Sequence, residues 1–545
     1  MNYKDLFKKD SNIMNKYYSM FEKNVKNLYT KDRAILDGEK NKYFDLINTK
    51  EMELKSKRPE IVINEMNQYF QRAVVWDNAT TMINITPPVT NISLAASNFC
   101  NVYNPNFAQD ESSGYLMTTE LIVVKYLSQL FGWDWLKSRG IFTFGGKGTN
   151  MYAVKAALNK INPNYRQNGI SSNNIIISNK NGHPCHIEIC DWLGIGRNSC
   201  LRLDVNENGQ LDPAEFELQL RKLLDQGKQV PCIILNGGTT NEVIVDLIKD
   251  IAVIRDRLVK EYQLSYNPHI HVDSVIGWAW IMFDNYDYVK NPLKMNDIDK
   301  QKIHSLCEKI KNIKYADSFG ADFHKTGFSP YISSCVIFKN GQDLYGLGGR
   351  EMIPYNDMMF GEYSPFEYSL ELSRAATGAV SAYVNMETLG KEGFCELIYN
   401  IYKSGEYIRS LIFELPDFEV INPQTEGFAT LFVIHKAGSS KKYKDYINSN
   451  DVDSFLKYNN DFFKFCIDML EKRKTNVKFT FSKSYKPFGA KCNMGALKIY
   501  QTSPIVEMSE VKLCIDEIVK LKRMFDESEY KSIESKNEPI DFVYR

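Results

Sequence analysis

Short apolar runs recur between about residue 140 and residue 273, and they alternate with stretches in which apolar residues repeat at helical spacing. An apolar run of roughly four to eight residues is typical of a buried strand, whereas repeats at i, i+3, i+4 and i+7 are typical of a helix that buries one face. The pattern predicts strands in the segments 141–144, 174–178, 200–205, 230–235 and 269–273.

Helices are predicted between these strands. The apolar residues of segment 151–161 fall on one helical face, and Asp212 stands directly before Pro213, an arrangement that favours a capped helix start. A further helix is expected to open at Asp246 and to continue to residue 258. Alternation of strand and helix predicts an α/β fold with a mostly parallel sheet covered by helices on both faces. Ligands of such sheets bind outside the carboxyl ends of the strands.

The chain is predicted to divide into three parts. Residues 1–70 have helical spacing and many Lys, Asn and Glu residues, so we expect an N-terminal helical arm. Residues 71–388 form the large domain, and residues 389–545 form a smaller C-terminal α/β domain. The elements expected in the smaller domain are strands in 428–436 and 496–502 and an amphipathic helix in 511–525.

Composition narrows the class of protein. The 545 residues include 67 basic and 67 acidic side chains, a balance that gives no global electrostatic case for binding nucleic acid or an anionic membrane. No apolar stretch has the length of a signal peptide core or of a membrane span. The eleven cysteines include no CxxC pair, so we expect reduced thiols, no metal site and a cytoplasmic protein.

Chemically capable residues follow the predicted strands in a suggestive order. They are the turn Gly145–Asn150, His183, the turn Gly237–Thr240, Asp273 and, later, Lys325 within FGADFHKTGFSP. A glycine turn at a helix start can bind phosphate, and an imidazole can stack on an aromatic ring. A carboxylate can keep a pyridine nitrogen protonated, and an amine can form a Schiff base with an aldehyde. Taken together, these are the groups that pyridoxal phosphate needs.

The same segments resemble a known family, the group II pyridoxal-phosphate-dependent amino-acid decarboxylases. The matching motifs occur in the family's order across roughly residues 90 to 390, and they are NVYNPNFAQDESSGYLMTTE, FGGKGTN, HPCHIEICDWLGIG, LNGGTTNEVIVD, HVDSVIG, ADSFGADFHK and SRAATGA. The resemblance implies the aspartate aminotransferase-like (type I) fold, pyridoxal 5'-phosphate as cofactor, and decarboxylation of an L-amino acid to the amine and carbon dioxide.

The resemblance also implies roles for individual residues. Lys325 would carry the cofactor as an internal aldimine, His183 would stack on its ring, and Asp273 would pair with its pyridine N–H. The other residues implied at the site are the phosphate turn, Gly146, Lys147 and Gly148, and two assisting residues, Thr240 and His324.

A mobile loop with a catalytic tyrosine is expected after the lysine, in segment 344–363. Tyr355 is the predicted proton donor, and Tyr345 and Tyr363 are its rivals. The family acts as a homodimer with active sites at the interface, so the resemblance implies that the arm 1–70 wraps around a second copy.

The sequence leaves several questions open. It does not say whether Trp278 and Trp280 shape the pocket or belong to the core, or what compensates the charge of Asp322. A pyridoxal-phosphate-dependent lyase or an aldehyde-forming enzyme is an alternative activity, and a non-catalytic scaffold with this fold is a third hypothesis. An aromatic and an acidic amino-acid substrate are equally compatible with the sequence.

Overall fold

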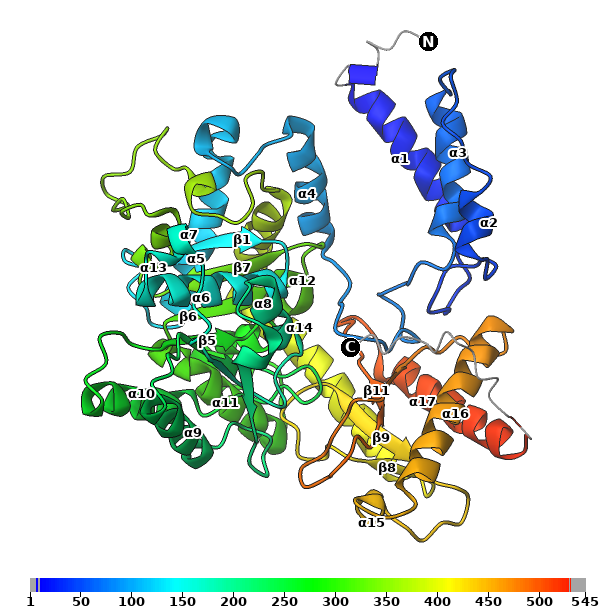
Figure 1. The fold of residues 1–545 in the computed structure, drawn as a ribbon. Helices are drawn as coiled ribbons and strands as arrows, with labels where there is room; N and C mark the ends of the chain where they lie inside the picture. The colour runs from blue at the N-terminus through cyan, green and yellow to red at the C-terminus, as the bar shows by residue number, and fades with distance from the viewer. Residues whose placement is uncertain (1–5, 8–9, 529, 531–545) are drawn as a thin grey trace.

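The computed structural model describes residues 6–7, 10–528 and 530. Figure 1 shows a large α/β body, a smaller C-terminal body beside it, and an N-terminal helical part that projects from the rest. Within the described ranges, no helix is both long enough and apolar enough to cross a membrane.

A seven-stranded sheet forms the centre of the large body. Its strand order is β1-β7-β6-β5-β4-β2-β3, with β7 antiparallel to β1 and β6 and the other neighbours parallel. The strands are β1 (Arg139–Thr143), β2 (Ile176–Asn179), β3 (Cys200–Leu203), β4 (Cys232–Asn236), β5 (His269–Asp273), β6 (Ser318–Asp322) and β7 (Ser334–Phe338). The five strands predicted from the sequence correspond to β1 to β5, and the predicted mostly parallel sheet is confirmed.

Helices cover both faces of this sheet. In β1, Ile141 packs in a cluster with Tyr152 of α6, whereas the next residue, Phe142, packs in the main core with Val124 of α5. The helices of the large body are α4 (Asn91–Tyr103), α5 (Thr118–Leu130), α6 (Gly146–Ile161), α7 (Tyr165–Asn168), α8 (Cys185–Trp192), α9 (Pro213–Asp225), α10 (Ile248–Glu261), α11 (Asp297–Lys311), α12 (Phe323–Thr326) and α13 (Gln342–Tyr345).

Two expectations about single residues are settled by the fold. The Asp212 side chain caps α9 by accepting from the Ala214 N–H, as predicted. Asp246 does not open α10, because its buried carboxylate accepts instead from the backbone N–H groups of Asn236 and Leu211.

Trp278 and Trp280 belong to the core, where each is almost wholly buried. The Trp278 ring lies 4.6 Å from that of Phe323, and its indole N–H donates to the Asp322 carbonyl at 3.2 Å. Trp278 therefore supports the backbone directly before Lys325.

The smaller body contains a four-stranded antiparallel sheet in the order β10-β11-β9-β8. Its elements are β8 (Phe418–Val420), β9 (Thr430–Ile434), α15 (Tyr443–Tyr446), α16 (Val452–Glu471), β10 (Thr480–Ser482), β11 (Ala496–Ile499) and α17 (Met508–Asp526). The strands expected in 428–436 and 496–502 and the helix expected in 511–525 appear as β9, β11 and α17. The long helix α14 (Thr377–Phe413) joins the two bodies and is broken at Gly390. The domain boundaries at 70 and 388 stay predictions.

The N-terminal part consists of α1 (Ser11–Lys26), α2 (Tyr43–Ile47) and α3 (Pro59–Phe70). Helices α1 and α3 pack on each other, with Phe21 against Phe70 and an ion pair of 2.7 Å between Lys16 and Glu60. Residues 1–5 and 8–9 of the predicted arm lie outside the described residues.

Candidate active site

The carboxyl ends of β5 and β6 and the start of α6 meet at one edge of the large sheet. Strand β5 ends at Asp273, β6 ends at Asp322, and the short helix α12 that follows β6 carries His324 and Lys325. Because β5 and β6 are paired in parallel, these side chains emerge at the same edge.

Lys325 is held by a carboxylate of its own turn. Its Nζ lies 2.9 Å from Oδ2 of Asp322, whose side chain is 1% exposed. The other oxygen, Oδ1, accepts a hydrogen bond of 2.5 Å from the Ser334 hydroxyl. A Cβ on Gly146 would stand 3.0 Å from Asp322 Oδ2, so the glycine lets the start of α6 approach this pair closely. The charge of Asp322, unexplained by the sequence, is therefore balanced by Lys325.

Asp273 is a buried carboxylate in which one oxygen accepts hydrogen bonds and the other does not. His186 Nε2 lies 3.2 Å from Oδ2, and the Asn150 amide donates to the same oxygen at 3.1 Å. Oδ1 is buried and has no hydrogen-bond partner among the residues that the structure describes. Burial alone would raise the pKa of Asp273, but the hydrogen bond from His186 and the nearby His183 and Lys325 together hold it below its usual range.

His183 lies beside both charged groups. It precedes α8, and its Nδ1 accepts from the Cys185 N–H at 3.1 Å. Burial lowers the pKa of His183 to about 3, Asp273 opposes this shift, and Lys325 adds to it. His183 is thus a neutral ring next to the amine and the carboxylate.

His324 is fixed by the next strand and by an aromatic neighbour. Its Nδ1 lies 3.0 Å from the Ser333 carbonyl oxygen, and its ring centroid lies 4.0 Å from that of Tyr331. The Tyr331 hydroxyl lies 3.2 Å from the Thr86 hydroxyl oxygen. Burial lowers the pKa of His324, which keeps its imidazole neutral.

The glycine turn before α6 is shaped as a phosphate site requires. Gly145 has a φ of 124°, and a Cβ on Gly148 would lie only 2.4 Å from Thr143 Oγ1. The ammonium group of Lys147 pairs with Glu188 and lies 4.8 Å from the centre of the Trp192 ring. The charge of Lys147 is therefore already compensated by a neighbour on α8.

Thr240 lies in the turn after β4, where its carbonyl accepts a hydrogen bond from the Tyr500 hydroxyl of the smaller body. This contact ties the turn to the residue that follows β11. Thr240 is thereby placed where the two bodies meet.

The structure does not bring the three loop tyrosines to Lys325. Tyr355 packs on Arg139, whose guanidinium lies 3.5 Å from the Tyr355 ring centre. Arg139 begins β1, so Tyr355 lies at the edge opposite to Lys325, a strand length of about 13 Å away. The rivals are also engaged elsewhere, since Tyr345 stacks on Tyr368 and the Tyr363 hydroxyl donates to Glu120.

Sequence reasoning did not identify four side chains that support the site: Asn150, Ser178, His186 and Tyr331. Two of them stood close to recognised motifs, since Asn150 ends GGKGTN and His186 follows His183 by three positions. A helix that starts at His183 puts the two histidines one turn apart, but this spacing alone does not tell that His186 faces Asp273.

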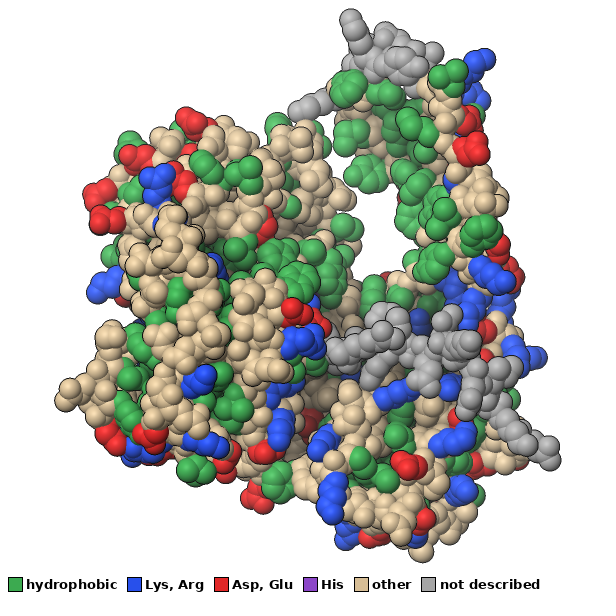
Figure 2. Space-filling view, in the orientation of Figure 1, with side chains coloured by type: hydrophobic (Ala, Val, Ile, Leu, Met, Phe, Trp, Pro, Cys, Tyr) green, Lys and Arg blue, Asp and Glu red, His purple; other side chains and the backbone are tan. Residues whose placement is uncertain are grey.

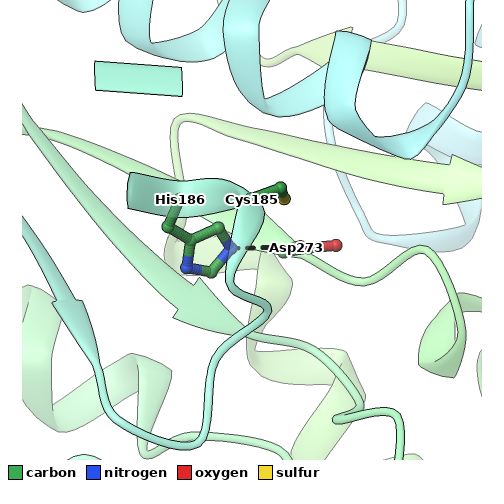
Figure 3. Close-up of side chains that lie close together, drawn as sticks. All are labelled: Cys185, His186 and Asp273. Atoms are coloured by element: carbon green, nitrogen blue, oxygen red, sulfur yellow. Dashed lines mark hydrogen bonds and ion pairs between the residues drawn. The ribbon is translucent and has the colours of Figure 1, made fainter. Parts of the chain in front are cut away.

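Cys185, His186 and Asp273 form a cluster whose ligand atoms lie within 4.8 Å of one another (Figure 3). Such a donor set could hold a zinc-like ion if the thiol lost its proton. Burial raises the pKa of Cys185 well above its usual value, and Asp273 Oδ2 already accepts from His186 and Asn150. Both features make the cluster a poor site for such an ion.

The residues at this edge fit pyridoxal phosphate. The open buried oxygen of Asp273 is suited to accept an N–H, the neutral His183 ring is suited to stacking, and Lys325 supplies an amine. The Gly145 turn adds the backbone of a helix start, whose first N–H groups can bind a phosphate.

Comparison with known proteins agrees with this fit. Mouse CSAD has the same fold, with a TM-score of 0.76 at 15% identity over 94% of this chain and 99% of that chain. The chain is 22% identical to "Acidic amino acid decarboxylase GADL1" of Xenopus tropicalis over 79% of this chain and 76% of the relative. It is also 22% identical to "Aromatic-L-amino-acid decarboxylase" of Bacillus atrophaeus over 57% of this chain and 58% of the relative.

The family model described as "Pyridoxal-dependent decarboxylase conserved domain" matches residues 45–434. The chain therefore belongs to the pyridoxal-dependent decarboxylases. It is an enzyme that uses pyridoxal phosphate to release carbon dioxide from an amino acid, a carboxy-lyase.

Proposed function

We propose that the edge formed by β5, β6 and α6 is the active site and that Lys325 binds the cofactor covalently through its amine. The observation that carries the proposal is that the amine of Lys325, held by Asp322, and the open buried oxygen Oδ1 of Asp273 lie at the same sheet edge. When bound, pyridoxal phosphate supplies an electron-withdrawing ring that accepts the electrons released as carbon dioxide leaves.

The chain's own residues then have separate tasks. Asp273 would accept a hydrogen bond from the protonated ring nitrogen and keep that nitrogen charged, and the neutral His183 would lie against the ring face. The backbone N–H groups at the start of α6, at Gly146 and Lys147, bind the phosphate, while the Lys147 and Glu188 side chains remain paired beside it. Gly148 belongs to the same turn, where its own N–H donates to the Gly145 carbonyl at 2.8 Å.

Thr240 and His324 complete the proposed set. His324, fixed by Ser333 and Tyr331, holds the substrate carboxylate and the cofactor in position. Thr240 contacts the cofactor from the turn after β4, and Tyr500 fixes the backbone of that turn.

Replacement of Lys325 tests the assignment. Lys325→Ala is expected to abolish carbon dioxide release, because no amine remains to bind the cofactor. Lys325→Arg is the matched variant, since it keeps a cation beside Asp322 but offers no reactive amine. Both are expected to fold, as judged by circular dichroism and thermal melting.

Carbon dioxide, amine, ammonia and peroxide are measured together in this assay, with L-glutamate, L-aspartate, L-tyrosine and L-tryptophan as substrates. Amine and carbon dioxide in equal amounts support simple decarboxylation, whereas ammonia and peroxide would indicate the aldehyde-forming alternative. Turnover by Lys325→Ala would overturn the site. The acidic and the aromatic relatives make both substrate classes part of the test.

We also infer a homodimer that uses the N-terminal part. Apolar side chains stand exposed on α1, α3 and α4, and Figure 2 shows hydrophobic surface on both sides of the gap between the projecting helices and the large body. These residues are Ile13, Met14, Tyr18, Ile61, Val62, Tyr69, Ile92, Leu94, Phe99 and Tyr103. A second copy of the chain would bury this surface, which is unusually apolar for a monomer.

A cytoplasmic location is part of the proposal. All eleven cysteines are free thiols, and ten of them are buried or half-buried, as expected of a protein from a reducing compartment.

A further inference from the structure

Three buried side chains from three different elements form a continuous chain of hydrogen bonds that ends at Asp273. Ser178 lies on β2, His186 on α8 and Asp273 at the end of β5. The Ser178 hydroxyl oxygen lies 2.6 Å from His186 Nδ1, and His186 Nε2 lies 3.2 Å from Asp273 Oδ2. Ser178 and His186 have no exposed surface.

The partners fix which ring nitrogen of His186 carries the proton. Burial lowers the pKa of His186, so the ring is neutral and has one donor and one acceptor nitrogen. An ionised carboxylate can only accept, which places the proton on Nε2. Nδ1 is then the acceptor, and the Ser178 hydroxyl donates to it.

The chain of hydrogen bonds also decides which oxygen of Asp273 stays open. His186 on α8 and Asn150 on α6 both donate to Oδ2. Oδ1 is left without a hydrogen-bond partner among the described residues. The other titratable groups whose charges act on Asp273 or are acted on by it are His183, His271, Lys325 and Cys185. His186 Nε2 reaches the carboxylate directly, at 3.2 Å from Oδ2.

We propose that Ser178 and His186 are positioning residues of the cofactor site: they hold Asp273 ionised and turn its Oδ1 toward the ring nitrogen of the cofactor. The proposal rests on the assigned role of Asp273. A hydrogen bond donated to a carboxylate makes it a weaker base, so the shared proton stays on the ring nitrogen. Without His186, the desolvated carboxylate becomes the stronger base and draws that proton away.

The test uses the full-length protein and the variants His186→Leu, His186→Gln and Ser178→Ala. The dissociation constant of pyridoxal phosphate is measured by titration, and the protonation of its ring is read from the ¹⁵N shift of cofactor labelled at the ring nitrogen. His186→Leu is expected to weaken binding about 10-fold to 100-fold, the range seen when a metal ligand loses the partner behind it, and to move the shift toward unprotonated pyridine. Ser178→Ala should change the dissociation constant and the ¹⁵N shift in the same direction as His186→Leu, but by a smaller amount. His186→Gln should keep both close to their wild-type values, because its amide can donate to Asp273.

Two controls separate the possible failures. Cys190→Ala removes a buried side chain from the same helix, in a separate apolar cluster, and should leave both readouts at their wild-type values. Asp273→Asn should lose affinity and ring protonation; if it does not, the proposed site itself is wrong. If Asp273→Asn loses them while His186→Leu and Ser178→Ala match the wild type, the site stands and the positioning role is refuted. If His186→Leu does not fold, a wild-type dissociation constant and ¹⁵N shift in Ser178→Ala refute the positioning role in the same way.

Discussion

Lys325 and Asp322 stand three residues apart and neutralise each other, with Asp322 buried and Lys325 mostly buried. Removing one partner of a buried pair leaves a desolvated charge, so Asp322→Asn is expected to lower the stability of the cofactor-free protein by about 3 kcal/mol. The double variant Asp322→Asn with Lys325→Met has no unpaired charge and should regain most of that loss. The free energy of unfolding is measured in denaturant for the cofactor-free wild type, Asp322→Asn, Lys325→Met and the double variant, which form a double-mutant cycle. If the two single losses of stability add up to the loss in the double variant, the pair is not coupled.

The residues that carry charge at the site could be foreseen from the sequence, whereas their partners could not. Asp273 ends an apolar run, and that position alone predicts a sheet edge, whereas the role of Lys325 follows from the resemblance of its motif to the family. Ser178, His186 and Asn150 meet Asp273 from three separate elements. Such a meeting depends on the packing of α6 and α8 against the sheet, and local spacing carries no information about it.

At the scale of elements, the strands predicted from the sequence are those whose residues form an apolar run. Strands β1 to β5 do so, but β6 begins with Ser318 and ends with Asp322, and β7 begins with Ser334. Asp322 and Ser334 lie at the site edge, whereas Ser318 lies at the other end of β6, and these polar ends hide the two strands from a pattern search. Asp246 was mistaken for a helix start because a carboxylate before an apolar repeat is typical of a cap, whereas here it binds backbone N–H groups of the sheet region.

Strand β5 makes the protein sensitive to acid. His269 and His271 lie on one face of β5 and share the Ser318 hydroxyl at 2.7 and 2.8 Å. Burial lowers the pKa of each to about 3, from a usual value of 6.5. Because unfolding lets both take up a proton, their contribution to stability is present above pH 6.5 and is lost as the pH falls toward 3.

Between pH 5 and pH 4 the two histidines together are expected to lower the free energy of unfolding by about 2.7 kcal/mol per pH unit. His271→Gln should reduce this slope by about 1.4 kcal/mol per pH unit, since one titrating group is removed. The slope is measured by denaturant unfolding at several pH values. The same change at the exposed His304 is the control, and a slope that His271→Gln leaves unaltered would contradict the assignment.

At the scale of the whole molecule, Tyr355 lies at the far sheet edge, so its role in catalysis depends on whether the protein is a dimer. Its ring packs on Arg139 and Trp135, and burial raises its pKa to about 12. Within one chain, about 13 Å of strand separates it from the edge that carries Lys325. If Tyr355 is the proton donor, its loop must either move a long way or serve the site of the partner in a dimer.

Mixed dimers distinguish these routes. Tyr355→Phe alone is expected to lower the rate of amine formation about 100-fold or more, as the loss of a proton donor usually does. When Tyr355→Phe and Lys325→Ala chains with different tags are purified as one heterodimer, action across the interface restores about half of the wild-type rate, because one of the two sites then has both residues. Action within one chain leaves both sites incomplete and gives no recovery, and failure to isolate any heterodimer contradicts the homodimer. Full activity of Tyr355→Phe would remove this residue from the reaction and make Tyr331, whose ring packs on His324 beside Lys325, the tyrosine to replace next.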